Sequence, residues 1–105
     1  MMRVGVCRGW RLLALGWLRV ELWSVPFGGV IPRHVHRRVA SRFVFLDRNL
    51  DVHRTGSTTT RALPWLRWYH VPAGCAHWAE ARRGRARFLN FEWGPVSASE
   101  DFTET

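Results

Sequence analysis

The stretch from Arg61 to Phe88 most constrains what this chain can fold into. The residues between Trp65 and Val71 follow the two-residue period of a β-strand, with no wholly polar face. Pro64 marks the start of this strand, because its ring disfavours a helical conformation in the residue before it. Pro72 and Gly74 mark its end. The stretch therefore predicts an extended strand between two turns.

Arginines crowd the end of the same stretch. Residues 75–81 are good or neutral helix formers, which predicts a short helix or turn, and Arg82, Arg83, Arg85 and Arg87 follow at once. These arginines are too close together in the sequence to be buried, so they predict an exposed basic arm. Guanidinium groups beside flat rings suit phosphates and bases, so the pattern fits a phosphate-rich partner. A core strand followed by a solvated arginine run explains it equally well.

Composition limits the fold and the partners. The chain has 105 residues, enough for one core, and its 16 basic residues are all arginine. A net charge of +8 predicts association with polyanions, with anionic membrane as the main competitor to nucleic acid. Residues 97–105 are acidic and poor in apolar side chains, which predicts a disordered tail.

The amino-terminal segment does not predict a membrane span or a leader. The apolar run from Leu12 to Leu18 is short, and Arg19 and Glu21 interrupt it. No small-residue cleavage site follows, and the first 23 residues contain no serine or threonine. The two cysteines, Cys7 and Cys75, give no disulfide framework and are expected as free thiols.

Short strands and turns recur along the rest of the chain. Residues 18–22 alternate apolar and charged side chains, as a half-buried strand with an apolar inner face would. Residues 25–32 supply a glycine and proline turn of a hairpin. Residues 47–61 predict a long surface hairpin, where extra length is tolerated. With about five such strands, the chain predicts an all-β fold and a small barrel.

The histidines have two interpretations. His34 and His36 would share one face of a strand and could bind zinc together with His70, Cys75 or His77. Structural zinc sites usually show tighter pairs of ligands, so a loop histidine facing phosphate is preferred and no metal or other cofactor is expected. No nucleophile with a base and no phosphate-binding glycine loop is present, so the sequence predicts no enzyme.

Several segments match a known pattern in order and approximate spacing. They are Gly5-Val6-Cys7, Leu18 to Leu22, Ile31-Pro32, His36, Phe43 to Leu46, Leu63-Pro64, Arg67, Tyr69-His70-Val71, Gly74 and Arg82 to Arg85. Together they resemble the small-subunit ribosomal protein S-twelve family. The chain departs from that family at Ala62, which replaces an acid, by one extra residue near Trp68, and at residues 8–17, which lack the family's decoding-centre loop.

The resemblance implies a five-stranded OB-type barrel. It divides the chain into an N-terminal extension (1–17), the barrel with its short helix or turn (18–81), a basic C-terminal arm (82–96) and the acidic tail (97–105). It also implies a structural constituent of the small ribosomal subunit, with rRNA, neighbouring ribosomal proteins and nearby tRNA or mRNA as partners and with no membrane. The strong divergence favours a mitochondrial ribosome, with a bacterial cytoplasmic source as the alternative.

The expected RNA contacts combine basic side chains with rings and one turn proline. They are Arg33, His36, Arg42, Arg61, Pro64, Arg67, Tyr69, His70, Arg82, Arg83, Arg85 and Arg87. Two other functions stay open. One is a free OB-type protein that binds single-stranded nucleic acid by aromatic stacking. The other is a membrane-active or spurious product rich in arginine and tryptophan, which the seven tryptophans suggest.

Overall fold

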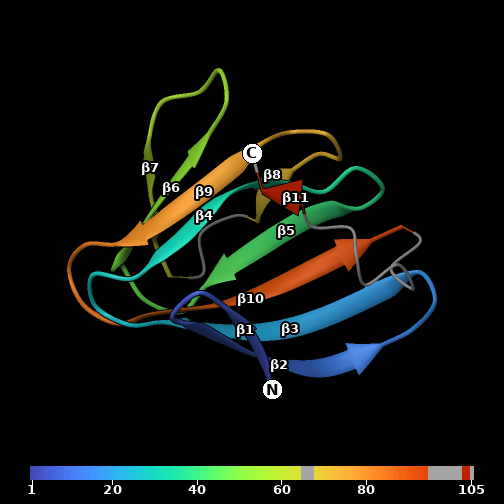
Figure 1. Cartoon of the computed structure of the whole chain (residues 1–105), viewed down its shortest axis with the longest axis horizontal. Helices are drawn as coiled ribbons and strands as arrows, with labels where there is room; N and C mark the ends of the chain where they lie inside the picture. Colours follow the sequence, from blue (N-terminus) through green and yellow to red (C-terminus); the bar gives the residue numbers. More distant parts are fainter. Residues whose placement is uncertain (65–67, 95–102, 105) are drawn as a thin grey trace.

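A computed structural model describes residues 1–64, 68–94 and 103–104, which form two antiparallel β-sheets and no helix (Figure 1). The six-stranded sheet contains, in spatial order, β1 (Met2–Val4), β2 (Cys7–Ala14), β3 (Leu18–Val25), β10 (Ala86–Trp93), β5 (Ala40–Phe45) and β8 (Tyr69–Val71). The five-stranded sheet contains β11 (Thr103–Glu104), β4 (Val30–Val35), β9 (His77–Ala81), β6 (Leu50–Arg54) and β7 (Thr60–Arg61).

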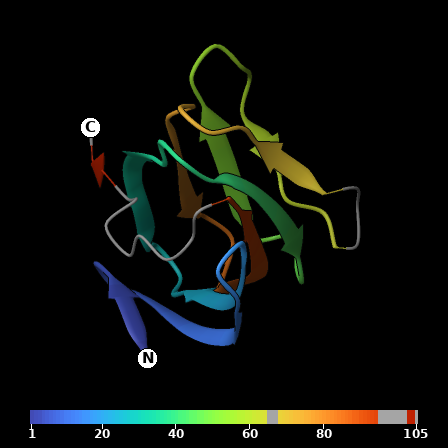
Figure 2. The ribbon, with the colours of Figure 1, turned by 90° about the vertical axis from the view of Figure 1, so that its right-hand side faces the viewer.

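The two sheets face each other, as the turned view in Figure 2 shows. Apolar side chains from both sheets form the core between them. Phe43, Phe45 and Phe88 come from the six-stranded sheet, and Leu50 and Val52 come from the five-stranded sheet. The rings of Phe43 and Phe88 meet edge to face with centroids 5.4 Å apart, an arrangement that aromatic quadrupoles favour. The core therefore joins the two sheets.

In the middle of the six-stranded sheet, the side chains of β3 that face inward are the charged ones, not the apolar ones as expected. Arg19 and Glu21 are buried, with 8% and 4% of their surfaces exposed, whereas Leu18 and Val20 on the other face are only half-buried. The pairing of Arg19 with Glu92 on β10 places another charge on the same inner face. The expectation of an apolar inner face is therefore wrong, because ion pairs inside the fold stabilise the buried charges.

The all-β class is confirmed, but the five-stranded OB-type barrel is wrong. Residues 1–17 provide β1 and β2 of the larger sheet. Residues 75–81 form no helix; from His77 to Ala81 they are β9, in which alternate side chains are buried. Helix propensity was overridden there by pairing with β4 and β6 on both sides. None of the described residues belongs to a helix that could cross a membrane.

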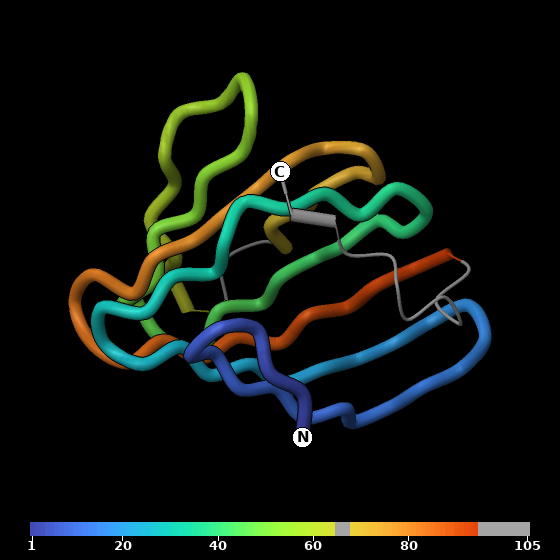
Figure 3. The backbone as a smooth tube through the Cα atoms, viewed as in Figure 1, coloured from blue at the N-terminus to red at the C-terminus, as the bar shows by residue number. Residues whose placement is uncertain are grey.

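The expected surface hairpin is present. β6 pairs with β7, and the tube in Figure 3 shows this hairpin standing out from the body. The strand expected between residues 65 and 71 is described only from Tyr69 to Val71, where it pairs with β5 as β8. Residues 65–67 lie outside the described part of the chain.

The predicted basic arm is a turn followed by a central strand. Residues 82–85 connect β9 to β10, and the remainder of the arm up to Trp93 is β10. Arg83 donates hydrogen bonds to the Arg48 carbonyl at 2.9 Å and to Asp51 Oδ1 at 2.7 Å. Arg85 donates to Ser24 Oγ at 3.1 Å. These guanidinium groups are held by the protein's own acceptors, so the segment is not an extended arm.

A methyl group at Gly9 should destabilise the fold, because its Cβ would lie 2.7 Å from the indole of Trp23. We expect Gly9→Ala to lower the free energy of unfolding by about 1–3 kcal/mol, the usual cost of overpacking. Gly16→Ala is the control, since no atom of the described residues lies within 4 Å of the position that a Cβ would take there. Urea denaturation measures both variants, and equal stabilities would contradict the close packing of Gly9 on Trp23.

Loss of the Asp51 carboxylate should matter at neutral pH and less in acid. The hydrogen bond from Arg83 lowers the pKa of Asp51, against an opposing effect of burial. A lowered folded-state pKa stabilises the protein above the ordinary aspartate pKa, and this contribution is lost as the pH falls through the folded-state value. We expect Asp51→Asn to cost about 1 kcal/mol at pH 7.

Denaturation at a series of pH values tests this expectation, and the difference from the parent should shrink toward acid pH. Arg82→Gln is the control, because the Arg82 guanidinium lies 4.0 Å from Asp51 and is mostly exposed. A constant difference at every pH would show that the carboxylate's charge is not responsible.

Candidate metal centre

Three histidines from two strands of the smaller sheet meet inside the molecule. His34 lies on β4, His36 follows that strand, and His77 begins β9, directly opposite His34 in the pairing. Each ring contributes one nitrogen atom to a group of three, and these three nitrogens all lie within 4.8 Å of one another. The His34 and His77 ring centroids are 4.1 Å apart. Such a group of nitrogen donors can converge on one metal ion.

A local irregularity in β4 places His34 in this group. The pairing between β4 and β9 shifts between Ile31 and His34, as at a β-bulge. Pro32 lies within the shift, and proline is compatible with a bulge because it has no N–H for the ladder. The bulge therefore changes which side chains of β4 face inward.

Backbone carbonyls orient two of the rings. His34 Nδ1 lies 2.7 Å from the Pro32 carbonyl oxygen, and His77 Nδ1 lies 3.0 Å from that of Cys75. A carbonyl only accepts, so Nδ1 carries the hydrogen in both rings and Nε2 keeps its lone pair. His77 Nε2 is buried and has no hydrogen-bond partner among the residues that the structure describes. A buried unpaired acceptor is costly, and a metal ion would satisfy it.

The protonation state of the pair also suits a metal. Burial, together with a smaller effect of the neighbouring His77, lowers the pKa of His34 to about 3. Burial also lowers the pKa of His77 to about 4, although the hydrogen bond to the Cys75 carbonyl opposes this effect. Both rings are therefore neutral at pH 7, which is the form that binds metals.

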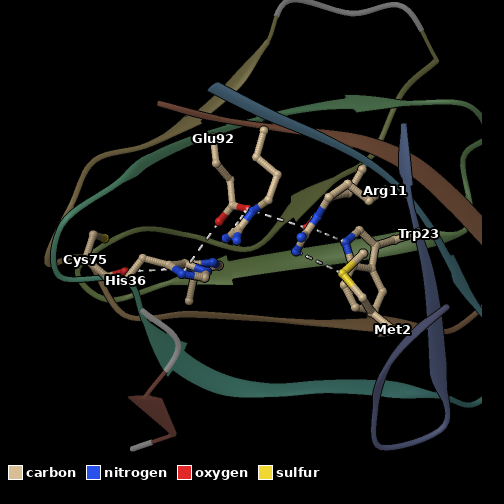
Figure 4. A network of polar contacts seen from close by, with 9 residues as sticks. Met2, Arg11, Trp23, His36, Cys75 and Glu92 are labelled. Carbon is tan, nitrogen blue, oxygen red and sulfur yellow. Dashed lines mark hydrogen bonds and ion pairs between the residues drawn. The ribbon is translucent and has the colours of Figure 1, made fainter. Parts of the chain in front are cut away.

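A chain of buried ion pairs extends from the histidines (Figure 4). Glu92 Oε2 lies 3.7 Å from His36 Nδ1, and Glu92 Oε1 accepts a hydrogen bond from Arg19 Nε at 2.9 Å. Arg19 also lies 3.2 Å from Glu21 Oε2, and Trp23 Nε1 donates to Glu21 Oε1 at 3.1 Å. Glu92 is only 1% exposed. Each buried charge thus has an opposite partner.

A cavity of about 310 Å³ adjoins both groups. Figure 4 shows His36 and Glu92 on one side and Arg11, Trp23 and Met2 on the other. All five of these residues line the cavity, together with apolar side chains of the core. A volume of this size accommodates a small organic molecule.

The expected RNA contacts do not form one site. The exposed ones belong to several strands and turns of both sheets; they are Arg33, Arg42, Arg61, His70, Arg82, Arg83, Arg85 and Arg87. Tyr69 and Pro64 are half-buried, and Arg67 lies outside the described residues. His36 is buried beside the cavity, so it is not a loop histidine facing phosphate.

Cation–π contacts hold two of these arginines on the protein's own rings. The Arg33 guanidinium lies 5.2 Å from the ring centroid of Trp78, and that of Arg42 lies 5.3 Å from the ring centroid of Trp93. Arg42 Nε also donates to His70 Nδ1 at 3.4 Å. These side chains interact within the fold rather than converging on one external surface.

Three of the histidines named in the zinc alternative, His34, His36 and His77, lie close together in the structure. Of the other two candidates, His70 is exposed on β8, and Cys75 contributes its backbone carbonyl to His77. Sequence reasoning missed Glu92 and Arg19. On β3 the signal was present as charged residues alternating with apolar ones, but it was interpreted as a strand with an apolar inner face. Glu92 lies on β10, in the segment that was interpreted as part of the basic arm.

Comparison with known proteins identifies the fold. No protein-family model and no curated protein sequence matches the chain. Among solved structures, it is similar to the DMSP lyase DddQ from Ruegeria pomeroyi, with TM-score 0.80 and 15% identity over 88% of this chain and 49% of the other. The chain thus spans about half the length of that lyase.

Two further structures share most of their length with this chain. A protein with a double-stranded β-helix domain from Klebsiella pneumoniae has TM-score 0.77 and 16% identity, covering 100% of this chain and 90% of its own. A cupin superfamily protein from Desulfitobacterium hafniense has TM-score 0.73 and 15% identity, covering 89% and 82%. At these identities the likeness establishes the fold alone.

The resemblance to the ribosomal S-twelve family is therefore wrong, and so are the function and partners that it implied. The similar structures are cupin, double-stranded β-helix proteins, and rRNA, ribosomal proteins, tRNA and mRNA are not supported as partners. Because these structures include a lyase, the fold does not exclude an enzyme. The chain has two facing antiparallel sheets of the cupin type, with a histidine cluster and a cavity between them.

Proposed function

We propose that the protein binds a divalent transition-metal ion through His34, His36 and His77 and acts on a small molecule in the adjoining cavity. The observation that carries this proposal is His77 Nε2, a buried acceptor that has no hydrogen-bond partner within residues 1–64, 68–94 and 103–104 and lies beside two further imidazoles. The carbonyl contacts of His34 and His77 support it, because metal-binding histidines commonly donate their second N–H to such a group.

The donor set limits the choice of metal. Imidazole nitrogens suit zinc, iron, nickel and copper, whereas magnesium and calcium prefer oxygen ligands. Three protein ligands leave a coordination position for water or substrate, as in catalytic zinc sites. When bound, such an ion supplies Lewis-acid chemistry, which polarises a carbonyl or lowers the pKa of a water molecule.

Glu92 and Arg19 help to orient a histidine of the proposed metal centre. The Glu92 carboxylate faces His36 Nδ1 at 3.7 Å and can hold the orientation of that ring. Arg19 Nε and Nη2 both lie 2.9 Å from Glu92 Oε1, so the carboxylate cannot turn away without losing two contacts. Glu92 also places negative charge near a site that would receive a cation.

The surroundings favour reaction with a small molecule over a structural metal site. A structural ion is usually enclosed by four protein ligands, but among the described residues the histidine cluster contains three and borders a cavity. Apolar walls around the cavity would exclude water from a bound substrate. The name of one similar structure, a DMSP lyase, agrees with catalysis in this fold.

Removing a histidine of the cluster should weaken metal binding. Metal-depleted protein is titrated calorimetrically with Zn²⁺ and with Ni²⁺, and the parent should bind one ion per chain. His77→Ala should lower the metal affinity at least about tenfold, because one of three ligands is lost. His70→Ala is the control, since that ring is exposed on β8. Equal affinities for parent and His77→Ala would disprove the centre.

Replacing Glu92 should weaken both metal binding and stability. We expect Glu92→Gln to reduce metal affinity about tenfold or more, the usual effect of losing a group that orients a ligand. It should also cost about 3 kcal/mol of unfolding free energy, because Arg19 loses a buried, oppositely charged partner. Glu80→Gln, on a half-buried position of β9, is the control. Unchanged metal affinity would limit Glu92 to a structural role.

A further inference from the structure

Arg11 is a guanidinium on the cavity whose own partners satisfy it poorly. Its Nη2 lies 3.6 Å from Met2 Sδ, a weak acceptor, and 3.6 Å from Glu21 Oε2, beyond ordinary hydrogen-bond distance. Glu21 is already engaged by Arg19 at 3.2 Å and by Trp23 at 3.1 Å. Arg11 has 44% of its side chain exposed, so a ligand can reach it.

The charge around the cavity favours an anion. The charged side chains that line it, apart from the histidines, are Arg3, Arg11, Arg19, Glu21 and Glu92, so cations exceed anions by one. The ion pairs of Arg19 with Glu21 and Glu92 compensate most of the buried charge. The excess positive charge therefore lies on the amino-terminal strands, and a metal ion at the histidines would add to it.

The cavity also has an unpaired acceptor and apolar walls. Asn90 lines the cavity, and its Oδ1 is buried without a hydrogen-bond partner in the described part of the chain. A buried amide oxygen of this kind is satisfied by a donor such as a hydroxyl group. Trp23, Ile31, Phe43 and Phe88 provide apolar lining for the body of a ligand. The cavity is thus lined by a positive charge at Arg11, by a hydrogen-bond acceptor at Asn90 and by apolar side chains between the sheets.

We propose that the cavity takes a small organic acid that carries a hydroxyl group, with its carboxylate on Arg11, its hydroxyl on Asn90 and an apolar body against Trp23 and Phe43. A carboxylate can accept two parallel N–H bonds from the planar guanidinium, which the Met2 sulfur cannot. This inference rests on the proposed function for its cavity, and it adds the class of ligand and the residue that selects its charge.

Calorimetric titration with mandelate, a hydroxy acid with one aromatic ring, tests the proposal against mandelamide, its uncharged analogue. We expect Zn²⁺-loaded parent protein to bind mandelate at least about tenfold more tightly than mandelamide, because charged hydrogen bonds are stronger than neutral ones. Arg11→Gln should lower mandelate affinity by about tenfold or more and leave mandelamide affinity unchanged. Arg11→Lys, which keeps the charge but loses the planar fork, should lie between parent and Arg11→Gln.

Arg8→Gln is the matched control. Arg8 is exposed on the same strand, pairs with Ser24 and lies outside this cavity, and its replacement should leave both affinities unchanged. Thermal melts of each variant check that the fold is retained, and if Arg11→Gln does not fold, Arg11→Lys alone decides. Equal mandelate affinities for parent and the folded Arg11 variants would overturn the proposal.

Metal content measured in the same samples separates the two hypotheses. Full zinc uptake without mandelate binding overturns the organic-acid site and leaves the metal centre in place. Mandelate binding that depends on Arg11 in protein that takes up no zinc supports the organic-acid site and overturns the metal centre. If replacing the histidines abolishes mandelate binding but replacing Arg11 does not, the ligand is held by the metal alone. That result also overturns the proposal.

Discussion

The pairing of buried charges in the six-stranded sheet sets the arrangement of the interior. Arg19, Glu21 and Glu92 lie on the inner face of β3 and β10 with at most 8% of their surface exposed. Each charge taken out of water must meet an opposite one, or the fold loses several kcal/mol. The resulting chain of ion pairs occupies space that apolar side chains would otherwise fill, and the cavity lies beside it.

The two sheets are joined by a polar contact as well as by apolar packing. The ion pairs belong to the larger sheet and the histidines to the smaller one, and the contact between Glu92 and His36 joins them. An apolar cluster around Phe43 and Phe88 holds the sheets at this spacing. A change in that packing would therefore move the carboxylate relative to the imidazole, which is how core substitutions would reach the site.

Local patterns predicted many strands but not their inner faces. The two-residue period marked strands near residues 18–22 and 69–71, and the hairpin of residues 47–61 was anticipated as a surface feature. Periodicity shows that two faces differ, yet it does not show which one is buried. On β3 the usual assumption placed Arg19 outside, and the same assumption interpreted the turn of residues 82–85 and the central strand β10 as an exposed basic arm.

The ribosomal resemblance failed for a related reason. Short matches such as Leu63-Pro64 and Arg82 to Arg85 consist of turn residues and surface arginines, which occur in many β proteins. Such residues describe where a chain turns and what it exposes. They carry little information about the order in which strands pair, and that order is what separates two facing sheets from a small barrel.

The order of amino acids was enough to establish that the chain is built of β-strands, that it is strongly basic, and that His34 and His36 can share a face. The folded arrangement was needed to show that His77 joins them, that Glu92 lies behind His36, and that Arg11 borders the same cavity. These contacts join residues far apart in the chain. Strand pairing and the burial of paired charges set such contacts, and neither leaves a local signal in the sequence.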